Sequence, residues 1–366
     1  MADRIADVAT VRARYGERAP VLIETTLLRR KAAAKLAGLP GLSGWLFTDE
    51  ALQQSTAQPV AAHRATRLAG RVVQDVTCSI GAELAVLGRT AGGCVGSDLD
   101  PVRLAMAAHN LSLDGRAPLL CRADALTPIT RDTVVVADPA RRSGGRRRFD
   151  PRDYMPPLDR LLEVYARRPL VVKCAPGIDF DALESMGFSG EVEVTSWGGS
   201  VREACLWSAE FAESPTVTRR ATVLDTGEQI TDAESDDAGV GPAGRWIVDP
   251  DGAVVRAGLV RHYAARHALW QLDPDIAYLS GEHLPPGVRG FEVVDRVPFN
   301  EKRIRAALTA LDCGALEILV RGVGVDPDAL RRRLRLKGSA ALTVVITRLG
   351  RGAAALPVAF VCRPSR

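Results

Sequence analysis

The stretch "RVVQDVTCSIGAELAVLGRTAGGCVGSDLDPVRLAMAAHNL", residues 71–111, decides the fold. An apolar run passes through a turn of small residues into a helical pattern, and the same order of apolar run and helical pattern then follows a second time. This alternation is typical of parallel strands joined by helices that cover both faces of a sheet. The stretch therefore predicts an α/β core.

The alternation continues as far as residue 210. Further apolar runs are "LLCRAD", "TVVVADP" and "PLVVKCAP". The last pair of runs, "EVEVTSW" and "REACLWSAEF", is separated by Gly198-Gly199, which predicts an antiparallel hairpin that closes the sheet. We therefore expect a doubly wound, Rossmann-like sheet of seven strands over residues 69–212, with the final strand reversed.

The segments that flank this core have other patterns. Residues 1–68 carry helical periodicity without a convincing strand and predict a helical N-terminal region. The acidic stretch "TGEQITDAESDDAGVG", residues 226–241, is too polar to pack and predicts a surface loop near a domain boundary. Strand and helix patterns then mix, which predicts a small α+β part over residues 213–290 and another over 291–366.

Composition excludes several classes of protein. Of 366 residues, 46% are hydrophobic and 25% charged, as in soluble globular proteins. Without a membrane-length apolar run or the apolar core of a signal peptide, the chain is expected to be cytoplasmic, with no membrane contact. The seven cysteines are scattered and the histidines lack ligand spacing, so we expect reduced thiols and no metal.

Carboxylates stand at the ends of consecutive predicted strands. In open parallel sheets the ligand binds beyond the carboxyl ends of the strands, so these side chains are candidates for a binding site. Asp100-Pro101 has a simpler explanation, because Asp at the N-cap and Pro at the first position are usual at a helix start. The candidate residues are Asp75, Asp98, Asp124 and Asp138.

The order of these strand ends resembles that of the class I S-adenosylmethionine-dependent methyltransferases. "DVTCSIG" resembles their first motif, "VGSDLD" the second, "RADAL" the third and "ADPARR" the fourth, so the resemblance covers residues 71–210. Two further segments, "LQQSTAQPVAAHRATRLAG" and "DALRRRLRLKGSAALTVVITR", resemble a bacterial family that joins this core to a THUMP-like C-terminal domain. The resemblance implies an enzyme with S-adenosylmethionine as its cofactor.

The resemblance also assigns a part of the cofactor to each motif. Asp98 would bind the ribose hydroxyls and Asp124 the adenine amino group. The first motif carries Thr77 and Ser79 where glycines are usual, but its side chains stay small and Gly81 is kept. The residues implied to bind the cofactor are Asp75, Thr77, Cys78, Ser79, Gly81, Asp98, Leu99, Asp124, Ala125 and Asp138.

The fourth motif departs from that of the family members that methylate amino groups. Those members carry Asp or Asn followed by Pro-Pro and an aromatic residue, whereas this chain has Ala140 and Arg141 at the last two positions. Asp138 would orient the acceptor, and Arg141 would stack on a flipped base through its guanidinium plane. The implied catalytic residues are Asp138, Pro139 and Arg141.

A cluster of arginines follows the fourth motif, and a second basic run covers residues 331–337, where we expect a helix with one basic face that ends at Gly338. Arginines close to the acceptor site would bind phosphates, although a solvated loop explains the same pattern because nearly all basic residues of this chain are arginine. Lys173 is a further candidate for substrate contact, with a buried ion pair as the alternative. The predicted substrate-binding residues are Arg142, Arg146, Arg147, Arg148 and Lys173.

These features favour methylation of a nucleobase nitrogen in structured RNA, either tRNA or rRNA, with RNA as the partner. An RNA-binding module whose methyltransferase core has lost catalysis remains an alternative, since the fourth motif is altered. A small-molecule or protein methyltransferase is a third possibility, but it explains the core and not the basic segments.

Overall fold

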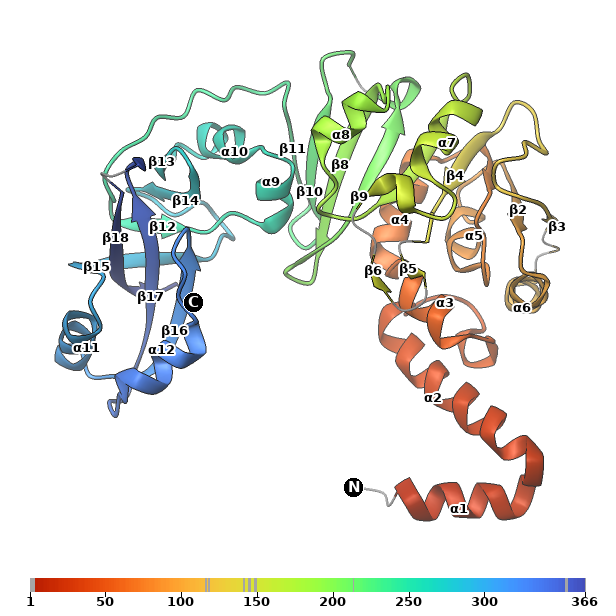
Figure 1. Cartoon of the computed structure of the whole chain (residues 1–366), viewed down its shortest axis with the longest axis horizontal. Helices are drawn as coiled ribbons and strands as arrows, with labels where there is room; N and C mark the ends of the chain where they lie inside the picture. Colours follow the sequence, from red (N-terminus) through yellow and green to blue (C-terminus); the bar gives the residue numbers. More distant parts are fainter. Residues whose placement is uncertain are drawn as a thin grey trace. The chain divides into compact units, whose positions relative to one another are not determined.

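The computed structural model describes residues 4–115, 117, 119–140, 142–143, 146–147, 150–212, 214–352 and 355–365, with backbone only for residues 4–7, 142–143 and 146–147. The chain divides into two compact units (Figure 1). Unit 1 comprises Met1–Trp197 and Val201–Pro215, and unit 2 comprises Gly198–Ser200 and Thr216–Arg366.

The N-terminal part of unit 1 is helical, as the sequence predicts. The long second helix packs against the core through Leu28 and Ala32, which are 3% and 0% exposed. The third helix begins at a capping residue, since the hydroxyl of Thr48 accepts a hydrogen bond from Ala51 N at 3.1 Å. These helices are α1 (Arg4–Tyr15), α2 (Ala19–Lys35), α3 (Asp49–Gln54) and α4 (Gln58–Arg67).

The sheet of unit 1 has its strands in the order β8-β9-β7-β4-β1-β2-β3. Strands β1, β2, β3, β4 and β7 pair in parallel, whereas β9 is antiparallel to β7, with Val172 opposite Leu206. The seven expected strands, with the final one reversed, are thereby present, and two further strands, Arg219–Val223 and Glu228–Thr231, bring the whole sheet to nine strands. Its strands are β1 (Val72–Asp75), β2 (Gly93–Asp98), β3 (Leu119–Arg122), β4 (Val134–Ala137), β7 (Leu170–Cys174), β8 (Gly190–Trp197) and β9 (Ser200–Ser208).

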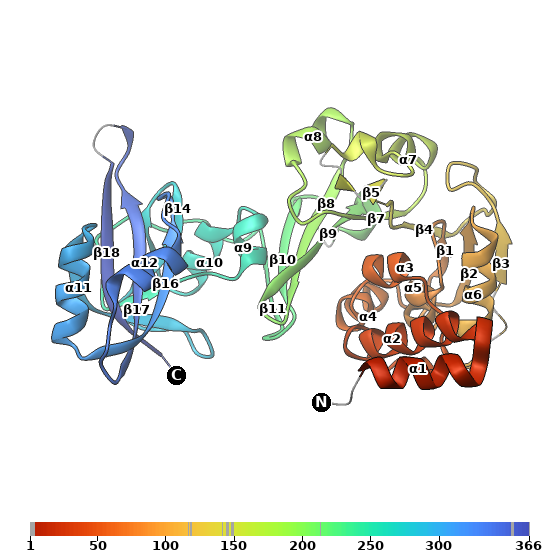
Figure 2. The ribbon, with the colours of Figure 1, turned by 60° about the horizontal axis from the view of Figure 1, so that its bottom comes forward.

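Helices cover both faces of this sheet, which explains why the central strand β4, with the sequence VVVA, is apolar and buried along its whole length. The first pair of helices is α5 (Ala82–Leu87) and α6 (Pro101–Ser112), and the second is α7 (Leu158–Val164) and α8 (Phe180–Ser185). Figure 2 shows α5 and α6 on one side of the sheet and α7 and α8 on the other. Val134 and Val136 pack with Leu84 and Leu111 of the first pair, while Val135, which points to the opposite face, is also buried.

Unit 2 begins with a hairpin that corrects the expectation for residues 226–241. Strand β10 (Arg219–Val223) pairs antiparallel with β11 (Glu228–Thr231), which lies inside the stretch expected to be a surface loop. Ile230 stands opposite Ala221 and is fully buried. A single apolar residue on the inner face is enough to fix a short strand when its partner strand is already in place.

The rest of unit 2 is a second sheet, in the order β13-β14-β12-β15-β18-β17-β16. Two of its helices pack on the last four strands through an apolar cluster that includes Ile304, Leu308 and Leu330. Its strands are β12 (Trp246–Val248), β13 (Trp270–Asp273), β14 (Ile276–Gly281), β15 (Gly290–Pro298), β16 (Cys313–Arg321), β17 (Ala340–Leu349) and β18 (Leu356–Pro364). Its helices are α9 (Gly252–Arg256), α10 (Val260–Arg266), α11 (Glu301–Ala310) and α12 (Pro327–Leu334).

The basic helix of unit 2 is shorter than expected. Helix α12 ends at Leu334, and Arg335 adopts the left-handed conformation with φ 48° instead of continuing the helix to Gly338. Leu330 and Leu334, which are 0% and 1% exposed, anchor the helix on the sheet.

Candidate active site

A cavity of about 660 Å³ lies in unit 1 at the carboxyl ends of the parallel strands. This volume is within the usual range for a small-molecule site. All four acidic strand ends line the cavity, as do most of the residues that the sequence motifs single out. The lining includes Asp75, Thr77, Cys78, Ser79, Asp98, Leu99, Asp124, Ala125, Asp138 and Lys173.

Other predicted site residues lie elsewhere. Gly81 and Pro139 adjoin lining residues but are not themselves part of the wall. Arg142, Arg146 and Arg147 belong to the short antiparallel pair β5 (Arg142–Ser143) and β6 (Arg146–Arg147), whose backbone alone is described. The predicted roles of Arg141 and Arg148 fall on positions outside the described residues.

The turn after β1 combines two residues in the left-handed region. Ser79 has φ 49°, and Gly81, with φ 83°, is the N-cap of α5. The positive φ of Gly81 favours glycine, and a Cβ atom there would also make tight contacts of 3.3 Å with Ala107 Cβ and with Leu111. The turn therefore brings backbone close to the cavity and also close to α6.

Asp75 is the most buried carboxylate of the site, at 3% exposure. Its Oδ1 accepts a hydrogen bond from Thr77 N at 3.0 Å. Burial raises the pKa of Asp75 to about 8, against the effect of this hydrogen bond. The nearby carboxylates of Glu83 and Asp138 act in the same direction as burial. A cationic group that entered the cavity beside Asp75 would favour its charged form.

Asp98 connects the turn after β1 with the end of β2. Its Oδ2 accepts a hydrogen bond from Ser79 N at 2.9 Å, and its Oδ1 accepts one from Asp100 N at 2.9 Å. Each carboxylate oxygen can accept more than one hydrogen bond, so the group retains capacity for hydroxyl donors in the cavity. Asp100 caps α6 by accepting from Val102 N at 2.8 Å, which confirms its predicted structural role.

One end of the cavity combines apolar and acidic groups. Leu99 is 58% exposed although it lines the cavity. Asp124 follows β3, and its Oδ1 accepts a hydrogen bond from Leu126 N at 2.8 Å. The buried carbonyl of Ala125 accepts a hydrogen bond from Tyr165 Oη at 2.7 Å. An apolar wall beside a carboxylate suits a flat ring that carries an amino group.

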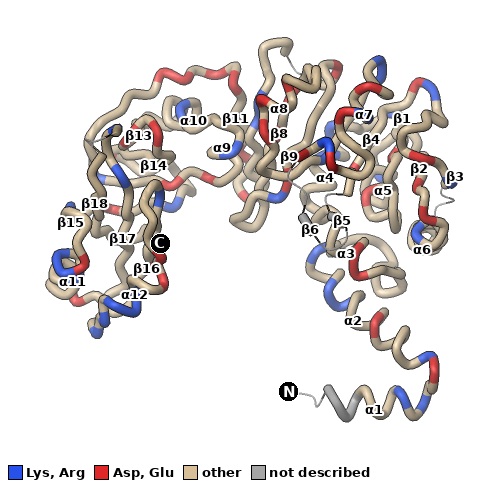
Figure 3. Tube along the Cα trace, in the orientation of Figure 1, with Lys and Arg blue, Asp and Glu red and all other residues tan. Residues whose placement is uncertain are grey.

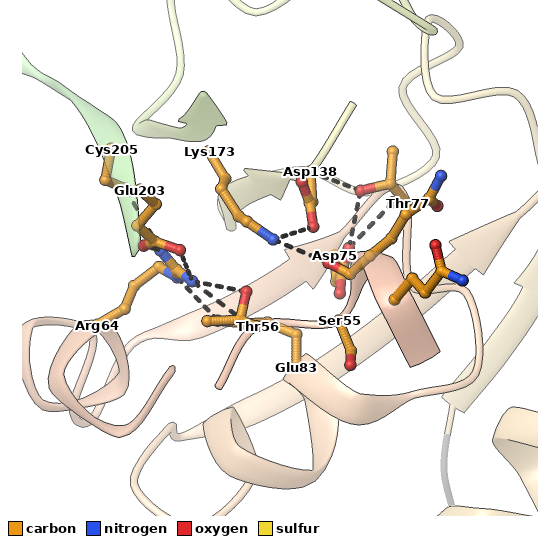
Figure 4. Close-up of polar contacts among 12 residues, drawn as sticks. Ser55, Thr56, Arg64, Asp75, Thr77, Glu83, Asp138, Lys173, Glu203 and Cys205 are labelled. Carbon is orange, nitrogen blue, oxygen red and sulfur yellow. Dashed lines mark hydrogen bonds and ion pairs between the residues drawn. The ribbon is translucent and has the colours of Figure 1, made fainter. Parts of the chain in front are cut away.

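Asp138 is fixed at both its backbone and its side chain (Figure 4). Its N–H donates to Thr77 Oγ1 at 2.7 Å. Its Oδ2 lies 2.6 Å from Lys173 Nζ in an ion pair whose side chains are 36% and 8% exposed, respectively. Lys173 therefore forms an ion pair, as its alternative expected, but only the lysine is buried, and its half-exposed partner is the predicted catalytic carboxylate.

Sequence reasoning missed a buried arginine at the cavity wall. Arg64 of α4, 3% exposed, donates from Nε to Glu83 Oε1 at 2.8 Å and pairs with Glu203 of β9 (Figure 4). The signal was an arginine on the apolar face of an otherwise alanine-rich helix, "QPVAAHRATR". Because a buried charge is costly without a partner, such a position points to a buried ion pair.

Sequence reasoning also missed the part of the cavity wall that follows the arginine cluster in the chain. Ala140 N donates to Met155 O at 2.8 Å, and Met155 N donates to Ala140 O at 3.0 Å. These bonds place Met155, 61% exposed, in the cavity wall beside the end of the fourth motif. Tyr154 and Pro156 line the cavity with it.

Two kinds of feature are absent from the described ranges. No helix there is both long and apolar enough to cross a membrane. Within the same ranges, His, Cys, Asp and Glu side chains form no group of three or more that could hold a metal ion.

The chain is similar to known proteins over nearly its whole length. Two curated relatives, from Mycobacterium tuberculosis strains CDC 1551/Oshkosh and ATCC 25618/H37Rv, are each 67% identical over 359 residues, which is 97% of this chain and 100% of the relative. Both carry the name uncharacterized S-adenosylmethionine-dependent methyltransferase.

Two further similarities concern the fold and the C-terminal part. The crystal structure of a candidate methyltransferase from Porphyromonas gingivalis W83 superposes with a TM-score of 0.76 at 19% identity, covering 96% of this chain and 91% of the other. Residues 288–364 match the family described as THUMP domain-like, so the expected THUMP-like domain is confirmed. With two relatives of such high identity over nearly the entire chain, the protein belongs to the S-adenosylmethionine-dependent methyltransferases and uses S-adenosylmethionine as its cofactor.

Proposed function

We propose that this methyltransferase methylates a nucleobase nitrogen of structured RNA, either tRNA or rRNA. The observation that carries the proposal is the presence of a THUMP-like domain in the same chain as a methyltransferase cavity lined by Asp138. The part of the cavity around Asp138, Ala140 and Met155 is called the acceptor end. The cofactor supplies a methyl group on a sulfonium that needs no further activation, so the protein has to hold the donor and align the acceptor.

The residues that bind the cofactor in this proposal are those of the first three strand ends. Asp98 accepts the ribose hydroxyls, and Asp124 accepts the adenine amino group beside the exposed Leu99. Asp75 lies deepest and favours the ammonium of the cofactor, because a buried carboxyl gains most from a nearby cation. The donor groups and the volume of the cavity fit this cofactor.

Asp138 orients the acceptor. Lys173 occupies its Oδ2, so the other carboxylate oxygen is directed to the N–H of an acceptor amine and offsets the positive charge that develops on nitrogen. Pro139, which is buried, fixes the backbone beside it, and Arg141 covers the base.

Basic residues supply the affinity for RNA in this proposal. Arg142, Arg146 and Arg147 belong to the β5–β6 pair, which lies in the chain between two residues of the cavity wall, Ala140 and Met155. In unit 2, Lys and Arg gather along α11 and α12 (Figure 3). Cations at both places would bind phosphates without regard to sequence, as a large folded RNA requires.

Nucleoside mass spectrometry of RNA tests the proposal. Total RNA from a deletion strain should lack one methylated nucleoside that the parent strain contains, and the purified enzyme with labelled cofactor should restore it. Asp138→Ala should abolish methyl incorporation while cofactor affinity stays within a few-fold, and the exposed Asp181→Ala should leave both unchanged. A wild-type enzyme that binds cofactor and RNA but methylates no RNA from that strain would contradict the proposal.

A further inference from the structure

The side chain of Lys173 is buried, and burial of an ammonium group costs free energy unless other groups compensate its charge. This side chain, at the end of β7, is 8% exposed. Its Nζ lies 2.6 Å from Asp138 Oδ2 and donates to the carbonyl of Gln54 at 3.2 Å. A buried ammonium is tolerated only when such partners replace water.

Gln54 is the last residue of α3, and the two carbonyls before it are bound in the same way. Lys35 of α2 donates to Leu52 O at 2.8 Å and to Gln53 O at 2.7 Å. The last carbonyls of a helix lack partners within it and form its negative end, so they attract cations. Two lysines from α2 and β7 therefore hold the end of α3 beside the acceptor end of the cavity.

The two lysines are close enough to influence each other. Burial and, to a smaller extent, the charge of Lys173 lower the pKa of Lys35 to about 8, whereas Asp138 acts in the opposite direction. Asp138 is thus joined through Lys173 to the same helix end that Lys35 binds. This arrangement leaves the carboxylate few orientations.

The fourth motif alone does not provide this restraint. Ala140 replaces the second proline that would stiffen the backbone in the amine-methylating pattern, and the backbone N–H of Asp138 is instead held by Thr77 Oγ1. That bond fixes the main chain but leaves rotation of the side chain free. The carboxylate needs a second contact, and Lys173 is the residue that provides it.

We propose that Lys173 is a positioning residue that sets the direction of the Asp138 carboxylate, and that the C-terminal end of α3 holds Lys173 for this purpose. The inference rests on the proposed function for the role of Asp138 itself. It makes the N-terminal helices a working part of the catalytic unit. It also replaces the expected direct contact of Lys173 with the substrate.

The interaction between Lys173 and Asp138 can be measured by NMR, without an assay of methyl transfer. The chain has only five lysines, Lys31, Lys35, Lys173, Lys302 and Lys337, so the ammonium groups of lysine-labelled protein can be assigned one by one by NMR. The Lys173 ammonium should give a slowly exchanging signal that shifts and broadens in Asp138→Asn. It should stay unchanged in Lys31→Ala, which removes an exposed pair between α2 and α3. A Lys173 signal that is indifferent to Asp138→Asn would overturn the inference.

Kinetics with RNA from the deletion strain then separates positioning from substrate contact. Lys173→Met should lower kcat at least tenfold with little change in KM for RNA or in cofactor affinity, and Lys173→Arg should recover part of the loss. Any residual single-turnover rate of Asp138→Asn should not fall further when Lys173→Met is added, because the effect of Lys173 passes through Asp138.

The two proposals fail in different ways. If Asp138→Asn is fully active, the proposed role of Asp138 is wrong, whatever the NMR result. If Asp138→Asn is inactive and Lys173→Met turns over like wild type, or raises only KM for RNA, the positioning role of Lys173 is wrong and that of Asp138 stands. Unchanged thermal stability and cofactor affinity in Lys173→Met show that the variant is folded.

Discussion

Asp98 holds the turn after β1 through Ser79 N and the start of the next helix through Asp100 N. Its proposed task is to accept the ribose hydroxyls. Asp98→Ala should weaken cofactor binding at least tenfold, about 1.4 kcal/mol, because a charged acceptor is removed. Calorimetry checks this. The matched control is Asp179→Ala, which removes a helix-capping carboxylate of α8. Equal affinities for Asp98→Ala and the wild type would move the ribose site elsewhere.

Burial of Asp75 has a consequence for stability. Since the pKa of Asp75 is raised from 3.8 to about 8, the folded protein keeps a proton that the unfolded chain releases. The free energy of unfolding should therefore fall as pH rises between these values, and Asp75→Asn should flatten this slope. The pKa of Lys35 is lowered from 10.5 to about 8, so this residue changes the pH dependence of the free energy of unfolding only above pH 8. Urea titrations of both proteins at several pH values provide the measurement, and equal slopes would contradict it.

At the scale of elements, the β5–β6 pair lies in the chain between Ala140 and Met155, which both line the cavity. Replacing Arg146, Arg147 and Arg148 with alanine should weaken RNA binding across sequences. The salt slope should fall by roughly 0.7 to 0.9 for each phosphate that the variant no longer neutralises. Cofactor affinity should stay the same. Binding of RNA that equals the wild type at every salt concentration would mean that this segment is a solvated surface.

Arg141 belongs to the same arginine cluster in the sequence but should behave differently. If it covers the acceptor base, Arg141→Ala lowers turnover more than affinity. Binding to phosphate alone would mean that the substitution lowers affinity and leaves turnover at saturation unchanged. Single-turnover kinetics beside an RNA-binding titration distinguishes the two.

At the scale of the whole molecule, each unit has its own apolar core, and the cavity belongs to unit 1. A ligand at about 100 times its Kd stabilises the unit that binds it by about 2.7 kcal/mol. For amides that exchange only when this unit unfolds, the same free energy means that hydrogen exchange slows roughly hundredfold. With cofactor, hydrogen exchange should slow around Asp75, Asp98 and Asp138 while β15–β18 stay unchanged. Slowing of equal size in β15–β18 would contradict a cofactor site confined to unit 1.

The sequence predicted the elements that depend on local pattern. Apolar runs separated by helical periodicity identified the strands of unit 1, and Gly198-Gly199 identified the hairpin that reverses the last one. Asp100 was predicted as a helix cap from its neighbour Pro101 alone. Local pattern failed at β11, where the buried Ile230 faces Ala221, and at the end of α12, where Arg335 adopts the left-handed conformation directly after Leu334.

By itself, therefore, the sequence determined the α/β core, the acidic strand ends and the family that they resemble, because period, spacing and residue type act along the chain. Only the tertiary structure decided that Lys173 pairs with Asp138, that Arg64 pairs with Glu203, and that α3 ends against two lysines. The first pair is 35 residues apart in the sequence and the second is 139 residues apart. Burial makes each such pairing obligatory but does not say in advance which partner the fold will supply.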